Sequence, residues 1–288
     1  RSESLQDISQ AVSALSDQDL KSKNIESFVD LNAIVPGVTV AKNEGYKTVI
    51  SIRGVGNETN QNAIAAPSVA FHMDGIFIAS PFALQTDFID VDRIEVIRGP
   101  QGTLFGQNST GGAINVISKK PSMDKNLSQY DLTLGNYGLS KFRSSNNLVI
   151  SESIATRISF AKTERDGYSS NIVNGQDLDD ANNFSLRGDL LFDINENSSL
   201  RFFGQYFEVD RNGSAMRGID DTNANIRNLS QDTLSKHQLT SSVLAAIYEN
   251  DLGFATLKAM ASIQEDDILV VRDNDRHNFG DLVLSIPG

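Results

Sequence analysis

A glycine-rich loop between two short β-patterned runs has the most distinctive residue spacing in the chain. A loop that binds nucleotide phosphate needs the pattern G-x-x-x-x-G-K-[ST]. Gly106 and Gly111 have the required separation, but Gly112 and Ala113 stand where the lysine and the hydroxyl residue must be. The loop therefore lacks the groups that hold phosphate, and we expect its glycines to let the two strands turn and pack closely. These structural glycines are Gly99, Gly102, Gly106, Gly111 and Gly112.

Histidines and acidic residues form no catalytic or metal-binding pattern in the sequence. His72, His237 and His277 show no paired spacing, and the chain has no cysteine that could act as a nucleophile or a metal ligand. Residues 273–277 resemble a calcium loop only weakly, because the required glycine and closing glutamate are missing. We therefore predict that the protein is not an enzyme and has no catalytic residue, metal site or cofactor.

Two arginines stand at the ends of apolar strand patterns. Arg53 follows Ile52 and Arg98 follows Ile97, and each precedes a glycine. A lone arginine in such a strand is costly unless its charge is paired. Two interpretations stay open: exposure at the strand ends, or a pair of cations that docks this domain onto acidic groups elsewhere. Glu95 is not the expected partner of Arg98, because side chains three residues apart on a strand point to opposite faces.

Composition narrows the class of protein. The formal net charge of −12 and the lack of a basic patch argue against nucleic acid as a partner. No apolar run approaches the ~20 residues that a membrane-spanning helix needs. A soluble protein or a β-barrel remains, since only helices and closed barrels span a bilayer. No signal peptide is visible in the polar residues 1–4, so we expect either a cytosolic protein or a mature or trimmed chain.

The elements that position these residues change type near Pro121. Before it, residues 16–23 and 24–33 predict helices, with Asn24 as the N-cap of the second and Pro36-Gly37 as its end. Residues 38–40, 48–53, 69–73, 75–78, 93–97 and 113–118 predict strands. We therefore place a small α+β domain at residues 1–122 and a second domain at residues 123–288.

The second domain consists of segments of about ten residues that alternate in polarity. In segment 184–194, Ser185, Arg187, Asp189 and Asp193 share one face and apolar residues share the other, except for Leu191. Segments 154–162, 200–208 and 255–263 alternate in the same way. Short turns (151–153, 195–198, 250–253) and long polar connectors (166–182, 211–235) join such segments. This pattern is typical of an outer-membrane β-barrel, whose apolar faces point outward and whose polar faces point inward. A soluble antiparallel sandwich also alternates and remains an alternative.

The glycine-rich segment also resembles the plug-domain signature of TonB-dependent outer-membrane receptors. The resemblance rests on residues 94–106 (IEVIRGPQGTLFG) and 110–115 (TGGAIN), and segments 51–56 and 69–76 follow the family's order. It implies an α+β plug domain inside a 22-stranded antiparallel transmembrane β-barrel. It also implies the outer membrane of a Gram-negative bacterium as the location. The implied partners are the TonB–ExbB–ExbD energy-transducing complex, outer-membrane lipid and a small-molecule ligand.

The family's pattern gives the two arginines a role and raises the question of length. In the family, plug arginines at the positions of Arg53 and Arg98 pair with barrel glutamates and lock the plug in place. After the plug there is room for only about seven strands. The chain also lacks a TonB box before Arg1 and a terminal aromatic residue. We therefore expect a fragment that holds a complete plug and about the first third of a barrel.

The solute is not fixed by the sequence. The family imports iron–siderophores, haem, cobalamin, nickel chelates and carbohydrates, and iron–siderophore uptake is the leading expectation because it is the most frequent. Uptake of carbohydrate, haem or cobalamin by the same mechanism is the alternative. A different class, a soluble β-rich binding module with an α+β cap, would purify without detergent.

The predicted ligand contacts lie on two plug loops, residues 57–66 and 80–87. Solute that enters a plugged barrel from outside meets these loops first, and loops on a rigid scaffold concentrate binding residues. Neutral amides suit sugars or chelates better than bare cations. Ordinary polar turns are the alternative interpretation. The predicted ligand-binding residues are Asn57, Glu58, Asn60, Gln61, Asn62, Phe82 and Gln85.

Overall fold

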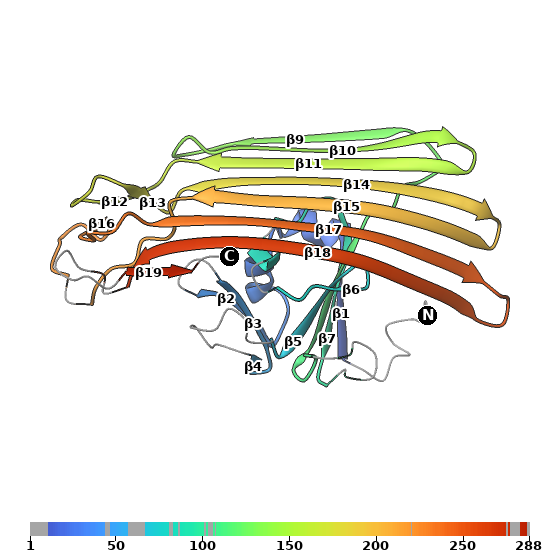
Figure 1. Cartoon of the computed structure of the whole chain (residues 1–288), viewed down its shortest axis with the longest axis horizontal. Coiled ribbons are helices and arrows are strands. Elements are labelled where there is room, and N and C mark those ends of the chain that lie inside the picture. The colour runs from blue at the N-terminus through green and yellow to red at the C-terminus, as the bar shows by residue number, and fades with distance from the viewer. Residues whose placement is uncertain are drawn as a thin grey trace. The chain divides into compact units, whose positions relative to one another are not determined.

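The computed structural model divides the chain into two compact units, Arg1–Lys119 and Lys120–Gly288. It describes residues 11–43, 47–56, 67–80, 83–85, 87–100, 102, 106, 108–219, 221–274, 276 and 283–286. The first unit mixes short helices with short strands, and the second is almost entirely sheet (Figure 1).

The first unit contains a five-stranded and a three-stranded sheet. Strands β5 and β8 are parallel, and the other pairs are antiparallel. The five-stranded sheet has the order β1 (Ala11–Ser16), β7 (Val91–Arg98), β8 (Gly112–Ser118), β5 (Val69–Met73), β6 (Ile76–Phe77). The three-stranded sheet has the order β2 (Val38–Asn43), β3 (Lys47–Ile52), β4 (Val55–Gly56). The hydrophobic core of the first unit includes Phe28, Leu31, Ile52, Ile94 and Ile114, which are at most 2% exposed.

The helices of the first unit differ from the sequence prediction at one point. Helix α1 (Asp17–Ser22) is capped by Ser16 and matches the predicted helix at 16–23. The prediction of a helix from Asn24 is wrong, because Asn24 has a left-handed φ of 51° and an N-cap needs extended backbone. Ser27 precedes a 3₁₀ helix instead, η1 (Phe28–Ala33), and its amide donates to the Asp30 carboxylate at 2.8 Å. A second 3₁₀ turn, η2, spans Ala83–Gln85.

The main sheet of the second unit has eight strands, and every neighbouring pair is antiparallel. Its two edges are β9 and β19, and no described strand joins them, so the sheet is open over the part of the chain that the structure describes. Among the described residues no helix is long and apolar enough to cross a membrane. The order is β19 (Val283–Ile286), β18 (Thr256–Asp273), β17 (Lys236–Asp251), β15 (Ser198–Arg211), β14 (Ala181–Asn195), β11 (Ile154–Arg165), β10 (Ser140–Ser151), β9 (Leu127–Leu134).

The two long connectors of this sheet fold together at one end of the strands (Figure 1). Short strands from both form a small sheet with the order β13 (Asp177–Leu178), β12 (Ser169–Asn171), β16 (Asn228–Leu229). Asn171 donates to the Gln231 carbonyl at 2.8 Å, and the Gln231 amide N–H donates back to Asn171 at 3.2 Å. Gln176 and Ser235 make a second reciprocal pair at 2.7 and 2.9 Å. The connectors therefore form one ordered layer.

The faces of the long strands have an inverted polarity. In β14, Ser185, Arg187 and Asp189 are at most 3% exposed, whereas Leu186 between them is 41% exposed. A soluble sandwich buries the apolar face, so the inversion favours the barrel interpretation. Strand β17 departs from strict alternation, since apolar side chains also lie on its buried face; they are Leu239, Val243 and Ile247.

Candidate functional site

Arg53 and Arg98 of the first unit both contact the turn Pro36-Gly37. The backbone amide of Arg53 donates to the Gly37 carbonyl at 2.7 Å, and Arg53 is exposed with a left-handed φ of 54°. The guanidinium of Arg98 donates to the Pro36 carbonyl at 3.4 Å and to the Ser13 hydroxyl at 3.1 Å. The residue after β3 and the last residue of β7, which belong to different sheets, thus bring the Arg53 backbone and the Arg98 guanidinium to one turn.

Glu95 contacts a different arginine. Its carboxylate accepts hydrogen bonds from Arg93 at 2.9 Å and from Asn115 at 3.4 Å. Asp92 also pairs with Arg93, at 2.9 Å. Glu95 therefore pairs with Arg93, which lies two residues away on β7.

Two adjacent glycines of the signature are required by close packing. A Cβ atom on Gly112 would lie 2.3 Å from the Ile97 carbonyl oxygen and 2.9 Å from Ile52, at a φ of 142°. A Cβ atom on Gly111 would lie 2.9 Å from the Val55 carbonyl oxygen. Side chains larger than hydrogen therefore cannot fit where β8 begins. Gly99 and Gly106 have a positive φ, but a Cβ atom on either would meet nothing within 4 Å. Gly102 has neither a positive φ nor a close neighbour.

The predicted ligand contacts fall mostly outside the described residues. Of the seven, only Gln85 is described, and it is half-buried at the end of η2. The role of the two loops in binding stays a prediction. The others are Asn57, Glu58, Asn60, Gln61, Asn62 and Phe82.

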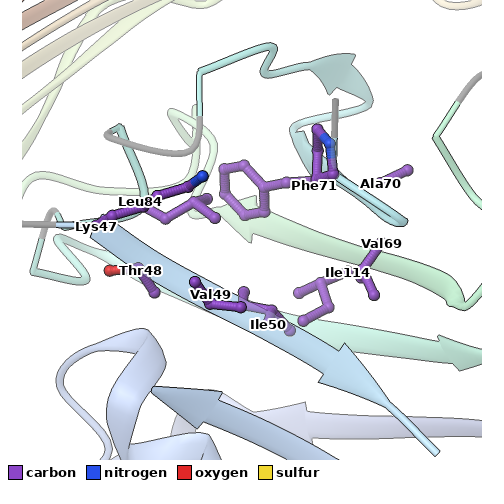
Figure 2. A pocket seen from close by; sticks show the side chains of 10 residues that line it. Lys47, Thr48, Val49, Ile50, Val69, Ala70, Phe71, Leu84 and Ile114 are labelled. Carbon is purple, nitrogen blue, oxygen red and sulfur yellow. The ribbon is translucent and has the colours of Figure 1, made fainter. Parts of the chain in front are cut away.

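A small enclosed cavity lies in the first unit between β3 and β5 (Figure 2). Apolar side chains such as Val49, Phe71 and Leu84 make up most of its wall. The Thr48 hydroxyl, in a residue that is 2% exposed, has no hydrogen-bond partner among the described residues. The cavity has room for about one water molecule, so it is far too small for a chelate or a sugar.

His72, in β5, gives the first unit a predicted pH dependence. Burial lowers the pKa of His72 below its ordinary value of 6.5. As the pH falls, His72 therefore takes up a proton in the unfolded chain before it does so in the folded one. The free energy of unfolding is thus highest above about pH 6.5 and declines below it. Replacing His72 with Leu should remove this decline. Urea unfolding of both proteins at about pH 7 and about pH 5 measures it; an equal loss of stability in the variant would assign the decline to other groups.

The second unit holds a buried charge cluster on the polar face of its sheet. Asp189 accepts from Arg187 at 2.8 Å and from Arg201 at 2.6 Å, and all three side chains are at most 4% exposed. Arg187 also donates to Gln205 at 3.0 Å, and its guanidinium lies 4.2 Å from the centre of the Phe203 ring. The cluster ties β14 to β15. The alternation in β14 indicated its polar face, but only the register of β15 brings Arg201 to Asp189.

No described part of the chain gathers a metal site. No group of three or more histidine, aspartate or glutamate side chains that could hold a metal ion occurs among the residues the structure describes. What the two units offer is a tightly packed glycine motif with two nearby arginines, and a strand sheet with a buried polar face.

Comparison with known proteins identifies the first unit. Residues 4–113 match the family model for the TonB-dependent Receptor Plug Domain. The chain contains a TonB-dependent receptor plug domain. The resemblance of the glycine signature to this family is thus confirmed, and the family consists of receptors and transporters.

Relatives and solved structures extend the likeness along the chain. The pesticin receptor of Yersinia pestis is 32% identical over 123 residues, which cover 42% of this chain and 17% of that receptor. The catecholate siderophore receptor Fiu of Escherichia coli K12 is 28% identical over 156 residues, 53% of this chain and 19% of Fiu. The chain thus spans less than a fifth of these curated relatives.

A solved structure matches both the plug domain and the strands. The ferric yersiniabactin uptake receptor FyuA of Yersinia pestis superposes with a TM-score of 0.80. The match covers 96% of this chain and 43% of FyuA at 18% identity, so it concerns the fold. A plug domain followed by antiparallel strands is therefore the fold class of the described chain.

Proposed function

We propose that this chain is part of an outer-membrane receptor that actively imports a scarce solute. The plug-domain match over residues 4–113 carries the proposal. The inverted polarity of the second unit supports it, because exposed apolar faces suit contact with lipid and buried polar faces suit a lumen. In this account, residues 1–122 form the plug, and residues 123–288 form the N-terminal part of a 22-stranded barrel in a Gram-negative outer membrane.

The TonB–ExbB–ExbD complex is the proposed source of energy. A plug blocks passive flow, so a bound solute passes only when the plug is moved. Pulling by TonB on a segment at the N-terminal side of the plug supplies that movement in this account. The long connectors and the outward plug loops then receive the solute.

The proposed solute is a ferric siderophore. FyuA takes up ferric yersiniabactin and Fiu is a receptor for catecholate siderophores, so two of the reported relatives support this class. The polar loop residues at 57–62 offer several amides and few apolar groups, which suits a polar chelate.

Arg53 and Arg98 are proposed to lock the plug to acidic residues of the barrel wall. Their common position at the Pro36-Gly37 turn supports a shared role. Replacing both with glutamine removes two charges and keeps hydrogen-bonding groups. We expect cells that make the full-length variant to admit a bulky hydrophilic antibiotic several-fold faster, the effect of losing about 1 kcal/mol or more of charge pairing. Unchanged permeability, with normal amounts of receptor in the membrane, would reject the proposed lock.

The ligand loops provide the test of the proposed function. We expect the triple replacement of Asn60, Gln61 and Phe82 with Ala to weaken binding of a ferric siderophore by about tenfold or more, since each lost hydrogen bond contributes ~0.5–1.5 kcal/mol. Binding is measured on outer membranes with radioactive iron in catecholate, hydroxamate and phenolate chelates. Asn197→Ala, on the exposed short turn between β14 and β15, is the matched control for expression. Failure of all three chelates to bind the wild-type receptor would reject the ferric-siderophore proposal.

A further inference from the structure

A short segment, residues 120–126, leads from the end of the first unit to strand β9. It belongs to the second unit and contains no helix or strand. The Ser122 hydroxyl donates to the Asp124 carboxylate at 2.8 Å and accepts from the Asp124 amide at 3.1 Å, so the middle of the segment forms a compact turn. The ladder between β9 and β10 begins directly after the segment, where Leu127 lies opposite Asn147.

Asn147 of β10 holds this segment with its side-chain amide. It donates to the Ser122 and Lys125 carbonyls, both at 2.8 Å, and its side-chain oxygen accepts from the Ser122 backbone amide at 2.8 Å. Both donors of the amide group are thus used, and Asn147 is only 2% exposed. Beside it, the Asn126 side chain accepts from the Val149 backbone amide at 2.7 Å. One buried side chain therefore fixes the segment to the sheet through three hydrogen bonds.

Two consecutive lysines mark the start of the segment. Lys119 is tied to the first unit, because its ammonium lies 2.9 Å from the Asp17 carboxylate and its backbone amide donates to the Asp90 carbonyl at 2.9 Å. Lys120 is tied to the second unit, where its ammonium lies 3.6 Å from the Glu249 carboxylate. The chain therefore passes from the contacts of one unit to those of the other between these two lysines.

The Asn147 amide holds the segment more strongly than the ion pair of Lys120 does. The side chains of Lys120 and Glu249 are 51% and 32% exposed, and ion pairs in contact with water contribute little to stability. The hydrogen bonds of Asn147 come from a buried side chain, where water competes less for the same groups. All three are lost together if that side chain is removed. Asn147 is therefore the residue on which attachment of the segment depends most.

We propose that Asn147 is a clamp that stops a pull on the plug from reaching the ladder between β9 and β10. The proposal rests on the proposed function, in which TonB pulls on the N-terminal side of the plug. A load that passes Lys119 along the chain meets the hydrogen bonds of Asn147 first. Without them it would act on the end of the ladder at Leu127, where the rungs break one after another. Asn147 is thus a positioning residue that lets the plug move while the strands keep their register.

Pulling on single molecules of the full-length receptor in a lipid bilayer tests the clamp. The cantilever is attached through Ser22→Cys, at an exposed position in a chain that has no cysteine of its own. The chain from this position to Lys119 is roughly 350 Å long when fully extended. The parent protein with this cysteine should show a force peak at that length. Asn147→Ala should move the peak outward by at least ~25 Å, the extended length of residues 120–126.

Asn146→Ala is the matched control, because Asn146 is the preceding residue of β10 and its side chain accepts from the Tyr130 hydroxyl at 3.2 Å. Lys120→Gln removes the ion pair with Glu249. Both variants should keep the peak of the parent. A peak at the same length in the parent and in Asn147→Ala, or no peak in the parent, would overturn the clamp. Attaching the cantilever through the TonB domain tests the proposed function separately: if TonB detaches without carrying load, the proposed source of energy is rejected, while the peak measured through Ser22→Cys still decides the clamp.

Discussion

Replacing Asp189 with Ala is expected to lower the free energy of unfolding of the second unit by about 3–5 kcal/mol, the cost of removing one partner from a buried ion pair. Asp189 bridges Arg187 and Arg201 at 2.8 and 2.6 Å, and the three side chains are at most 4% exposed. Without the carboxylate, the guanidinium groups of Arg187 and Arg201 would lose the counter-ion that they share across β14 and β15. Urea unfolding in detergent measures the loss.

Two comparisons separate this charge effect from a loss of packing. Asp193→Ala removes the same side chain from the same strand at an exposed position, so it should change stability by less than about 0.5 kcal/mol. Replacing all three cluster residues with apolar residues of similar volume should recover most of the stability. If Asp189→Ala is as harmless as Asp193→Ala, the cluster does not hold the two strands together.

Replacing Gly112 with Ala is expected to destabilise the plug domain by about 3 kcal/mol or more. The new Cβ atom would lie 2.3 Å from the Ile97 carbonyl oxygen, which belongs to the neighbouring strand and cannot move independently. It would also impose a φ of 142° on a residue with a side chain. Faster hydrogen exchange of the β7 and β8 amides should report this local loss of stability.

Gly102 is the matched control within the same signature. A Cβ atom there would meet nothing within 4 Å, and its φ is not in the left-handed region. Gly102→Ala should leave plug stability within about 0.5 kcal/mol of the parent. Equal damage from both substitutions would mean that the signature as a whole, and not close approach at Gly112, sets the stability.

Strand type and polarity could be predicted from the sequence because they depend on local pattern. The alternation of residues 184–194 anticipated β14, and the short and long connectors anticipated how its neighbours are joined. Strand β1 was missed, because its six residues include small polar side chains and gain their order by pairing with β7 about eighty residues away. The predicted helix start at Asn24 was wrong, because the left-handed backbone of Asn24 cannot be inferred from its residue type, and the helical turns begin at Phe28.

Sites that depend on strand register could not be predicted from the sequence. Arg187 and Asp189 are two residues apart, but Arg201 joins them only through the pairing of β14 with β15. Gly188 and Gly204 lie opposite each other through the same pairing. Arg53 and Arg98 were singled out as a pair, but their common contact with the Pro36-Gly37 turn needed the arrangement of two sheets.

Uptake of radioactive iron tests whether the receptor imports a ferric siderophore. Cells that carry the full-length gene, cells without it and cells without TonB receive the same ferric siderophores at low concentration. At least one chelate should enter wild-type cells in a saturable manner, and either deletion should abolish its uptake. Uptake of every chelate at the wild-type rate after deletion of the receptor gene would contradict the account.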